Sequence, residues 1–288
     1  MIFNEVRSIF VYHKKLLYLC KRRITIPRFS IGIDIGSVGV KAVLFDGGIA
    51  DAVLLPTGWS PKESALQALE KMFCGTGDVS RSSVPVVATG YGRKSVSSAN
   101  KRVTEITCHA RGVRWLAPLA RTVLDIGGQD SKVILLGEDG SVEDFAMNDK
   151  CAAGTGRFLQ MMAHVLDYDI GDFGAVDPWG EFQPISSMCA VFAETEVVGH
   201  LARGVDRESI VRGLLRSIAS RSAAMLARIG MREPLFFSGG VSRSPSLARL
   251  IGREAGCEIL TSDRSQFAGA IGAALIGWED EERSGNHT

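Results

Sequence analysis

The stretch DIGGQDSKVIL at residues 125–135 decides the fold, because a second copy of its pattern, DIGSVGVKAVL, stands at residues 34–44. Both copies consist of Asp-Ile-Gly, four further residues, Lys and an apolar run. Each copy follows a short β-type run and precedes a Gly-containing turn signal, at residues 46–48 and 138–140. The repeat therefore predicts that each half of the chain opens with a strand, a tight turn, a strand, a turn and a third strand.

Helical patterns follow each set of predicted strands. Apolar spacing and capping residues predict helices over four ranges, 62–73, 105–116, 156–166 and 207–229. A strand at residues 234–237 runs into Gly239 and Gly240, a short strand follows at residues 258–260, and small residues predict a closing helix over residues 266–274. Strand–helix alternation in two repeated halves predicts an α/β fold, with two similar lobes facing each other across a ligand cleft.

Composition and charge exclude some classes of protein but do not indicate a partner. Of 288 residues, 33 are basic and 32 acidic, so charge gives no argument for nucleic acid or a membrane surface. The six cysteines form no CxxC pair. We therefore expect a reducing cytoplasm and no disulfides. No apolar run reaches the roughly 18 residues that suggest a membrane span.

The first 29 residues differ from the rest of the chain because they mix basic residues with a short apolar run. We interpret residues 1–29 as a poorly ordered extension, although a basic amphipathic segment that touches a membrane or partner is the alternative. Cys20 is discounted with it. The expected first lobe is residues 30–119, and the expected second lobe, which carries the candidate ligand cysteines, is residues 120–288.

The repeated hairpins predict nucleotide chemistry. A Gly-rich turn between strands points backbone N–H groups inward and cradles phosphate. Asp34 and Asp125, each at the end of a first strand, are candidates for Mg²⁺ placement. Gln129 or Asp130 is the candidate for orienting the attacking water, since positioning is most of phosphoryl-transfer catalysis. Lys41 is a candidate phosphate contact, with a solvated strand-edge lysine as the alternative.

The stretch NDKCAAGTGR at residues 148–157 places Cys151 where we expect a helix to begin. Unpaired N–H groups and the helix dipole favour a thiolate there, the form that binds metal or acts as a nucleophile. Cys189 also precedes a predicted helix. Of the other cysteines, Cys74 and Cys257 are interpreted as small core residues, and Cys108 as a helix residue beside His109.

Four stretches carry a resemblance to a known family: ATGYGR at residues 88–93, residues 125–132, 147–158 and 189–196. They resemble the activator ATPases of 2-hydroxyacyl-CoA dehydratases and the related ATPase subunits of benzoyl-CoA reductases. The resemblance covers the chain from Ser30 to Trp278, and the cysteine-containing stretch is the most specific part. It implies two ribonuclease H-like lobes of the actin, Hsp70 and sugar kinase ATPase fold around a nucleotide cleft.

The resemblance also implies an ATP site. The first loop departs from the commoner family form at Val38 and Gly39, and the loss of a hydroxyl there predicts one weaker phosphate contact. The implied ATP-binding residues are Gly36, Ser37, Val38, Gly39, Val40, Lys41, Gly127, Gly128, Gly154, Thr155, Gly239, Gly240 and Gln266.

The family further implies a homodimer that holds one 4Fe–4S cluster between its subunits, and Cys151 and Cys189 match the two ligand positions. A 4Fe–4S cluster normally takes four thiolates. Two ligand-like cysteines per chain fit a two-fold symmetric dimer with the cluster on its axis. Zinc accepts the same four thiolates, so the residues alone leave the metal open.

The expected function is therefore an ATP-driven one-electron donor. Its expected partners are a dehydratase or reductase component acting on a CoA ester and, upstream, a ferredoxin or flavodoxin. Two alternatives remain open from the sequence. One is a small-molecule kinase of the same fold, for a sugar or amino sugar. The other is a zinc-stabilised, nucleotide-gated interaction module.

Overall fold

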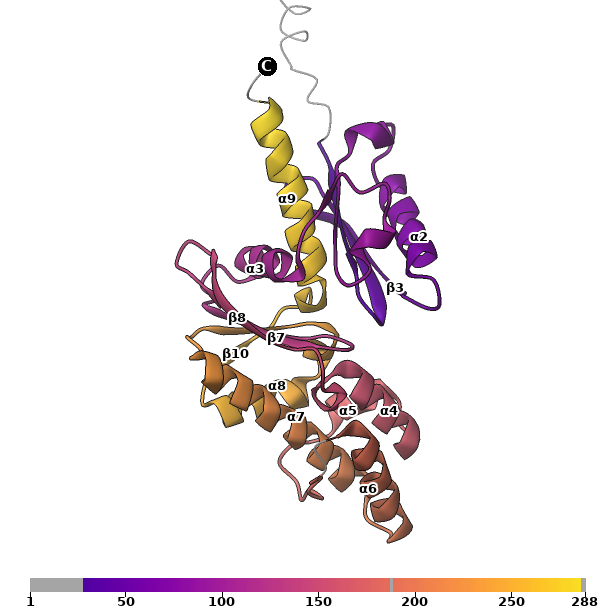
Figure 1. Ribbon diagram of the computed structural model, residues 1–288, viewed down its shortest axis with the longest axis vertical. Helices are drawn as coiled ribbons and strands as arrows, with labels where there is room; N and C mark the ends of the chain where they lie inside the picture. The colour runs from indigo at the N-terminus through magenta and orange to yellow at the C-terminus, as the bar shows by residue number, and fades with distance from the viewer. Residues whose placement is uncertain (1–27, 187–188, 286–288) are drawn as a thin grey trace, which may run out of the picture.

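The computed structural model describes residues 28–186 and 189–285 (Figure 1). Cys20 and all but Arg28 and Phe29 of the expected N-terminal extension lie outside the described residues. Within the described ranges, no helix has both the length and the apolar character needed to cross a bilayer.

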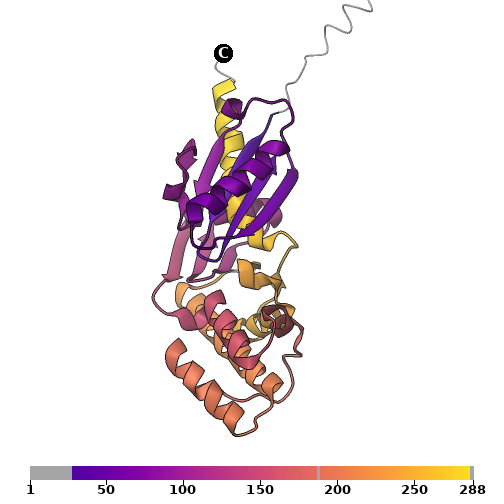
Figure 2. The same cartoon turned by 90° about the vertical axis from the view of Figure 1, so that its right-hand side faces the viewer.

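The first sheet contains the earlier copy of the repeat. Its strand order is β3-β2-β1-β4-β5. Alternate residues of β1 point to opposite faces. Ile31 and Ile33 pack with Ala68 and Met72 of the helix α2, so α2 covers one face (Figure 2). The elements are β1 (Ser30–Ile35), β2 (Gly39–Phe45), β3 (Ile49–Pro56), α2 (Pro61–Cys74), β4 (Val86–Thr89) and β5 (Lys101–Arg102).

The second sheet repeats the first, with the order β10-β9-β6-β7-β8. Asp34 pairs with Lys41 in the first sheet, and Asp125 pairs with Lys132 in the second. A bulge interrupts the pairing of the second and third strands in both copies, after Leu44 and after Leu135. The strands are β6 (Thr122–Ile126), β7 (Ser131–Leu136), β8 (Val142–Asn148), β9 (Leu235–Ser238) and β10 (Ile259–Leu260). The predicted internal repeat is confirmed.

Helices of the second half form the largest core cluster, together with β6 and β9. They gather at the end of the molecule opposite the first sheet (Figures 1 and 2). The predicted helices over residues 156–166 and 207–229 are confirmed, and Asp206 caps the latter through Ser209 N. These helices are α4 (Gly156–Leu166), α5 (Ile170–Ala175), α6 (Ala190–Ala202), α7 (Arg207–Ile229) and α8 (Pro245–Ala255).

Two helices, α3 (Glu105–Leu116) and α9 (Ala268–Gly285), join the halves. They cross where both carry glycine: a Cβ on Gly112 would lie 1.9 Å from Ala268 O, and a Cβ on Gly272 would lie 1.8 Å from Cys108 O. The buried side chains of α3 that belong to one core cluster pack with the second sheet. Those of α9 pack with the first sheet, which it flanks in Figure 1. The strands divide between the sheets near residue 119, yet the last helix returns to the first sheet, so the expected lobe boundaries stay a prediction.

Candidate functional site

The two predicted phosphate hairpins touch each other. A Cβ on Gly128, in the β6–β7 turn, would lie 2.4 Å from Val38 Cγ2 and 2.8 Å from Ser37 Oγ in the β1–β2 turn. Each turn is closed by a backbone hydrogen bond, from Gly36 N to Gly39 O (3.1 Å) and from Gly127 N to Asp130 O (2.9 Å). The structure thus brings the two halves of the predicted nucleotide site together, and a side chain at position 128 would wedge them apart.

The turns that follow β4 and β9 are a second equivalent pair. Gly90 and Gly239 have φ of 90° and 89°, a region that favours glycine. A Cβ on Gly90 would lie 2.5 Å from Asp34 Oδ1, and a Cβ on Gly239 would lie 2.9 Å from Asp125 Oδ1. Gly239 was expected in the site, but Gly90 was missed. The sequence signal for Gly90 is a small hydroxyl residue followed by glycine at the end of a strand, which occurs in both halves as Thr89-Gly90 and Ser238-Gly239. In each half this strand runs parallel to the strand that carries the aspartate.

The two Asp–Lys pairs differ in their surroundings. Lys41 Nζ lies 3.6 Å from Asp34 Oδ2. Lys132 Nζ lies 3.5 Å from Asp125 Oδ2, but also 2.8 Å from Asp130 Oδ2 and 2.9 Å from Glu105 Oε2. The Lys132 side chain is only 3% exposed. The repeat therefore encodes one simple pair and one buried lysine surrounded by three carboxylates.

Asp125 is the most enclosed carboxylate of the site. Ser238 Oγ donates to Asp125 Oδ1 over 2.9 Å, and His109 Nδ1 lies 3.3 Å from the same oxygen. Burial raises the pKa of Asp125, but attraction to His109 and Lys132 and the Ser238 hydrogen bond outweigh it and lower the pKa to about 2. Burial lowers the pKa of Lys132, and its carboxylate neighbours, Asp125 first, raise it above the ordinary lysine value.

The two candidate residues for orienting the attacking water differ in whether protein contacts hold their side chains. Asp130 is bound to Lys132 through Oδ2. Its Oδ1 lies 2.7 Å from where a Cβ on Gly127 would stand, so the carboxylate folds back over its own turn. Gln129, at the tip of the same turn, is exposed.

A set of hydrogen bonds ties the β6–β7 hairpin to the segment before α4. Gly127 O and Gly128 O accept from Gly156 N and Arg157 N, both over 2.9 Å. Ser131 Oγ, at the start of β7, donates to Gly154 O over 2.8 Å. The first N–H groups of α4 thus bind the hairpin.

The expectation that Cys151 begins an α-helix is wrong. Cys151 precedes the single 3-10 turn η3 (Ala152–Gly154), and α4 begins only at Gly156, after Thr155. Asn148 holds the cysteine backbone at both ends: its Oδ1 accepts from Cys151 N and its Nδ2 donates to Cys151 O, each over 3.2 Å. The helix starts late because the hairpin carbonyls pair with the N–H groups of residues 156 and 157. Gly154 and Thr155 are buried beside the hairpin.

Cys189 is placed as expected, as the N-cap residue of α6, with Cys189 O accepting from Ala193 N over 2.9 Å. It is exposed, whereas Cys151 is partly buried. The first turn of α6 exposes two large apolar side chains, Val191 (66%) and Phe192 (68%). Cys189 therefore lies beside an exposed apolar patch.

The remaining described cysteines have three different settings. Cys108 is buried in α3, and burial raises the pKa of its thiol to about 12. Burial also raises the pKa of Cys257, which is partly exposed. Cys74 is exposed at the end of α2, so its interpretation as a core residue is wrong. Within the described ranges, no group of three or more His, Cys, Asp or Glu residues is arranged to hold a metal ion.

The Gly239–Gly240 turn opens on one side. A Cβ on Gly240 would meet nothing within 4 Å, and this residue begins the 3-10 helix η4 (Gly240–Arg243). Gln266 lies in the neighbouring 3-10 helix η5 (Ser265–Phe267), which precedes α9. The implied ATP-binding residues Gly239, Gly240 and Gln266 are thus brought together, and the space beside Gly240 is open.

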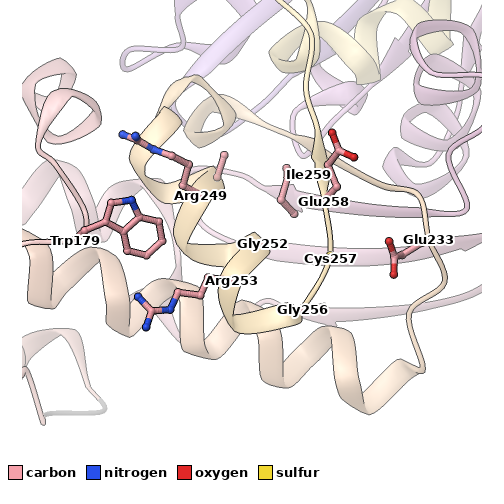
Figure 3. Close-up of a pocket in the computed structure, with 10 residues that line it drawn as sticks. Trp179, Glu233, Arg249, Gly252, Arg253, Gly256, Cys257, Glu258 and Ile259 are labelled. Carbon is pink, nitrogen blue, oxygen red and sulfur yellow. The ribbon is translucent and has the colours of Figure 1, made fainter.

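A separate cavity of about 610 Å³ lies at the other end of the second sheet (Figure 3). Trp179, Arg249, Arg253 and Cys257 are among its lining residues, and the Arg253 guanidinium lies 5.0 Å from the Trp179 ring centroid. It adjoins the start of β10, whereas the β6–β7 hairpin follows the end of β6, which runs parallel to β9 and therefore to β10. This cavity is not the nucleotide site.

Comparison with known proteins identifies the family. Residues 31–277 match the BadF/BadG/BcrA/BcrD ATPase family. A 2-hydroxyisocaproyl-CoA dehydratase activator from Clostridioides difficile is 40% identical over 259 residues, covering 89% of this chain and 97% of the relative. A benzoyl-CoA reductase component from Thauera aromatica is 32% identical over 258 residues, covering 85% of this chain and 92% of the relative.

A solved structure gives the same result. The activator of the 2-hydroxyisocaproyl-CoA dehydratase from Clostridium difficile with bound ADPNP is 39% identical, with a TM-score of 0.85 over 90% of this chain and 98% of that chain. The expected α/β fold with two lobes of the actin, Hsp70 and sugar kinase type is confirmed. Because the match extends over nearly all of the described residues at this identity, the chain belongs to the BadF/BadG/BcrA/BcrD ATPase family.

Proposed function

We propose that this protein is an activator that uses ATP hydrolysis to donate single electrons to a dehydratase or reductase acting on a CoA ester. The family is one of ATPases, and the relatives include a dehydratase activator and a component of a benzoyl-CoA reductase. The proposed working form is a cytoplasmic homodimer that takes its electrons from a ferredoxin or flavodoxin and shares one 4Fe–4S cluster between its subunits.

One observation carries this proposal: the phosphate hairpin is bonded to the segment that holds Cys151. Gly127 O, Gly128 O and Ser131 Oγ all bind residues 154–157. Asn148, which pairs with Ser131 across β7 and β8, grips the Cys151 backbone. A displacement of the hairpin by nucleotide phosphate therefore moves the cysteine as well.

The thiols fit a cluster shared between two chains. Cys151 and Cys189 precede α4 and α6, and Phe158 and Ala193 of these two helices belong to one core cluster. Two cysteines per chain supply half of the four thiolates that a 4Fe–4S cluster normally takes, so a second copy completes the set. When bound, such a cluster transfers one electron at a time. The exposed Val191 and Phe192 side chains give the second copy an apolar surface beside the thiol.

Within the nucleotide site, we assign Mg²⁺ placement chiefly to Asp34. Both Asp125 oxygens have partners in the protein: Ser238 Oγ binds Oδ1, and Lys132 Nζ lies 3.5 Å from Oδ2. Among the described residues, the ion pair found for Asp34 is the one with Lys41, at 3.6 Å. Lys41 Nζ also lies 3.4 Å from where a Cβ on Gly36 would stand, close enough to the turn to reach phosphate. Gln129 orients the attacking water, because Lys132 already binds Asp130.

Substitution of Cys189 tests the cluster. Protein purified without oxygen is expected to contain about four iron atoms per dimer, and Cys189→Ser is expected to lose nearly all of them. Cys257→Ser is the matched control, since this partly exposed cysteine lies at the far end of the second sheet. Iron and zinc are measured by elemental analysis. Unchanged iron in Cys189→Ser rejects the ligand assignment, and zinc in place of iron in the wild type supports the interaction-module alternative.

Removal of the Ser131 hydroxyl is expected to weaken the link between nucleotide and cysteine. In cluster-free protein, ADPNP should change the alkylation rate of Cys151, measured by peptide mass spectrometry. Ser131→Ala should still bind ADPNP, but its rate change should shrink by a factor of about 5, the effect of about 1 kcal/mol of coupling. Ser246→Ala is the control, because its buried hydroxyl also donates to backbone carbonyls but in another part of the core. An undiminished rate change in Ser131→Ala contradicts the link.

A further inference from the structure

His109 lies between the aspartates of the two repeats, although neither the repeat nor the family motifs marked it as a site residue. It is 5% exposed on α3, next to the crossing with α9. Its Nδ1 lies 3.3 Å from Asp125 Oδ1 and 3.5 Å from Ser238 Oγ. These contacts fix the ring so that one nitrogen faces Asp125.

The other nitrogen faces Asp34. A Cβ on Gly269 would lie 3.0 Å from His109 Nε2 and 3.1 Å from Asp34 Oδ2. The two atoms are therefore no further apart than the sum of these distances, and no side chain of Gly269 fills the space. Within the described part of the chain, no hydrogen bond to Nε2 is found. The Nε2 atom of a largely buried histidine and an Asp34 oxygen thus lie around one small space beside Gly269.

We infer that this space takes a water molecule bound to Mg²⁺, and that His109 is a positioning residue for the magnesium nucleotide. Mg²⁺ dehydrates reluctantly and keeps several waters, whose protons need acceptors. A neutral imidazole that donates Nδ1–H to a carboxylate presents Nε2 as an acceptor, so in this form His109 Nε2 and Asp34 hold the water together. The inference rests on the proposed nucleotide site and extends it.

The positioning role of His109 also assigns a function to the buried Asp125. Both of its oxygens are bound within the protein, so it does not face the ion directly. It acts through the ring instead, as an acidic partner that sets the orientation of His109. A carboxylate behind a histidine at a metal site does the same elsewhere, and its loss typically costs 10–100-fold in metal affinity.

Two substitutions at His109 separate positioning from simple core packing. The amide of Asn reaches the position of Nδ1 and keeps a donor for Asp125, but it leaves nothing in the place of Nε2. The longer Gln places its amide near Nε2 instead. Isothermal titration of ADP with Mg²⁺ and with EDTA measures how much Mg²⁺ tightens binding. His109→Asn is expected to reduce this tightening about 10-fold or more while melting close to the wild type, and His109→Gln is expected to restore part of it.

Filling the space tests the same idea without touching the histidine. Gly269→Ala places a methyl group between Nε2 and Asp34, and it is expected to reduce the Mg²⁺ effect as His109→Asn does. Gly277→Ala is the control on the same helix, where the nearest atom is Val87 Cγ2 at 3.2 Å. Full Mg²⁺ tightening in both His109→Asn and Gly269→Ala overturns the inference, as does ADP binding by the wild type that is indifferent to Mg²⁺. A wild type that binds no ADP at all refutes the proposed function instead, and the inference with it.

Discussion

Gly272→Ala is expected to destabilise the protein by about 3 kcal/mol or more, the upper end of the cost of overpacking. The added methyl group would stand 1.8 Å from Cys108 O and 2.8 Å from Gly112 N. All three close atoms, including Cys108 C at 2.7 Å, belong to the backbone of α3, so no side chain can rotate away. Relief requires α3 and α9 to separate. Urea unfolding at neutral pH measures the loss as a lower midpoint.

Gly199→Ala is the matched control for this prediction. Gly199 is also a helical glycine, in α6, but a Cβ there would meet only Arg203 Nη1, at 3.6 Å on a flexible side chain. Alanine is favoured over glycine inside helices by about 1 kcal/mol, so this variant is expected to be neutral or stabilised. Equal midpoints for the two variants would mean that α3 and α9 are not held together by their close approach.

The crossing also matters for the site, because α3 carries Glu105 and His109. Glu105 binds Lys132, and His109 lies against Asp125, so two side chains from the helix complete the surroundings of the second hairpin. A variant that separates the helices should therefore lose nucleotide affinity as well as stability. This dependence explains why small residues occupy the contact: a larger interhelical distance would pull both side chains out of the site.

Local patterns in the sequence predicted the repeated hairpins and most helices. Both hairpins depend on residues close together in the chain, such as Asp34 with Lys41 and Asp125 with Lys132, so an 11-residue pattern contains them. The helix over residues 207–229 has an aspartate cap at its start and a left-handed glycine after its end. Periodicity and caps of this kind are local signals, and they are readable without knowledge of the fold.

The features that sequence reasoning missed depend on distant contacts. Cys151 was expected to begin a helix, but hairpin carbonyls at residues 127 and 128 set the start of α4 at Gly156. The positioning role inferred for His109 depends on the fold, which places α3 between Asp34 and Asp125. Gly90 belongs to the site because β4 lies parallel to β1, a pairing between strands far apart in sequence. Pairings of this kind have no local signature.

Lys132→Met is expected to cost about 3–5 kcal/mol, because it leaves buried carboxylates without their cation. Three carboxylates lie within 3.5 Å of Lys132 Nζ, and the side chain is 3% exposed. Lys41→Met is the matched control, since Lys41 holds the same register position in the other hairpin. It faces one carboxylate, at 3.6 Å, and its side chain is 16% exposed. The control is expected to lose about 1 kcal/mol, the upper value for a pair in contact with water.

The pH dependence of the Lys132→Met loss follows from the two pKa shifts. The pKa of Asp125 is lowered to about 2 in the folded protein, against about 3.9 in an unfolded chain. Its ionisation therefore stabilises the fold above about pH 4 and ceases to do so as the pH falls towards 2. The pKa of Lys132 is raised, so its charge stabilises the fold at all pH values below the ordinary lysine range. Both contributions are complete at pH 7. Removal of Lys132 lets the pKa of Asp125 rise, so the deficit of Lys132→Met relative to the wild type should be largest at pH 7 and smaller at about pH 3.

Urea midpoints at both pH values measure this difference. A deficit that is independent of pH, or no greater than that of Lys41→Met, would mean that Lys132 stabilises the protein through packing rather than through the charges of Asp125 and its neighbours.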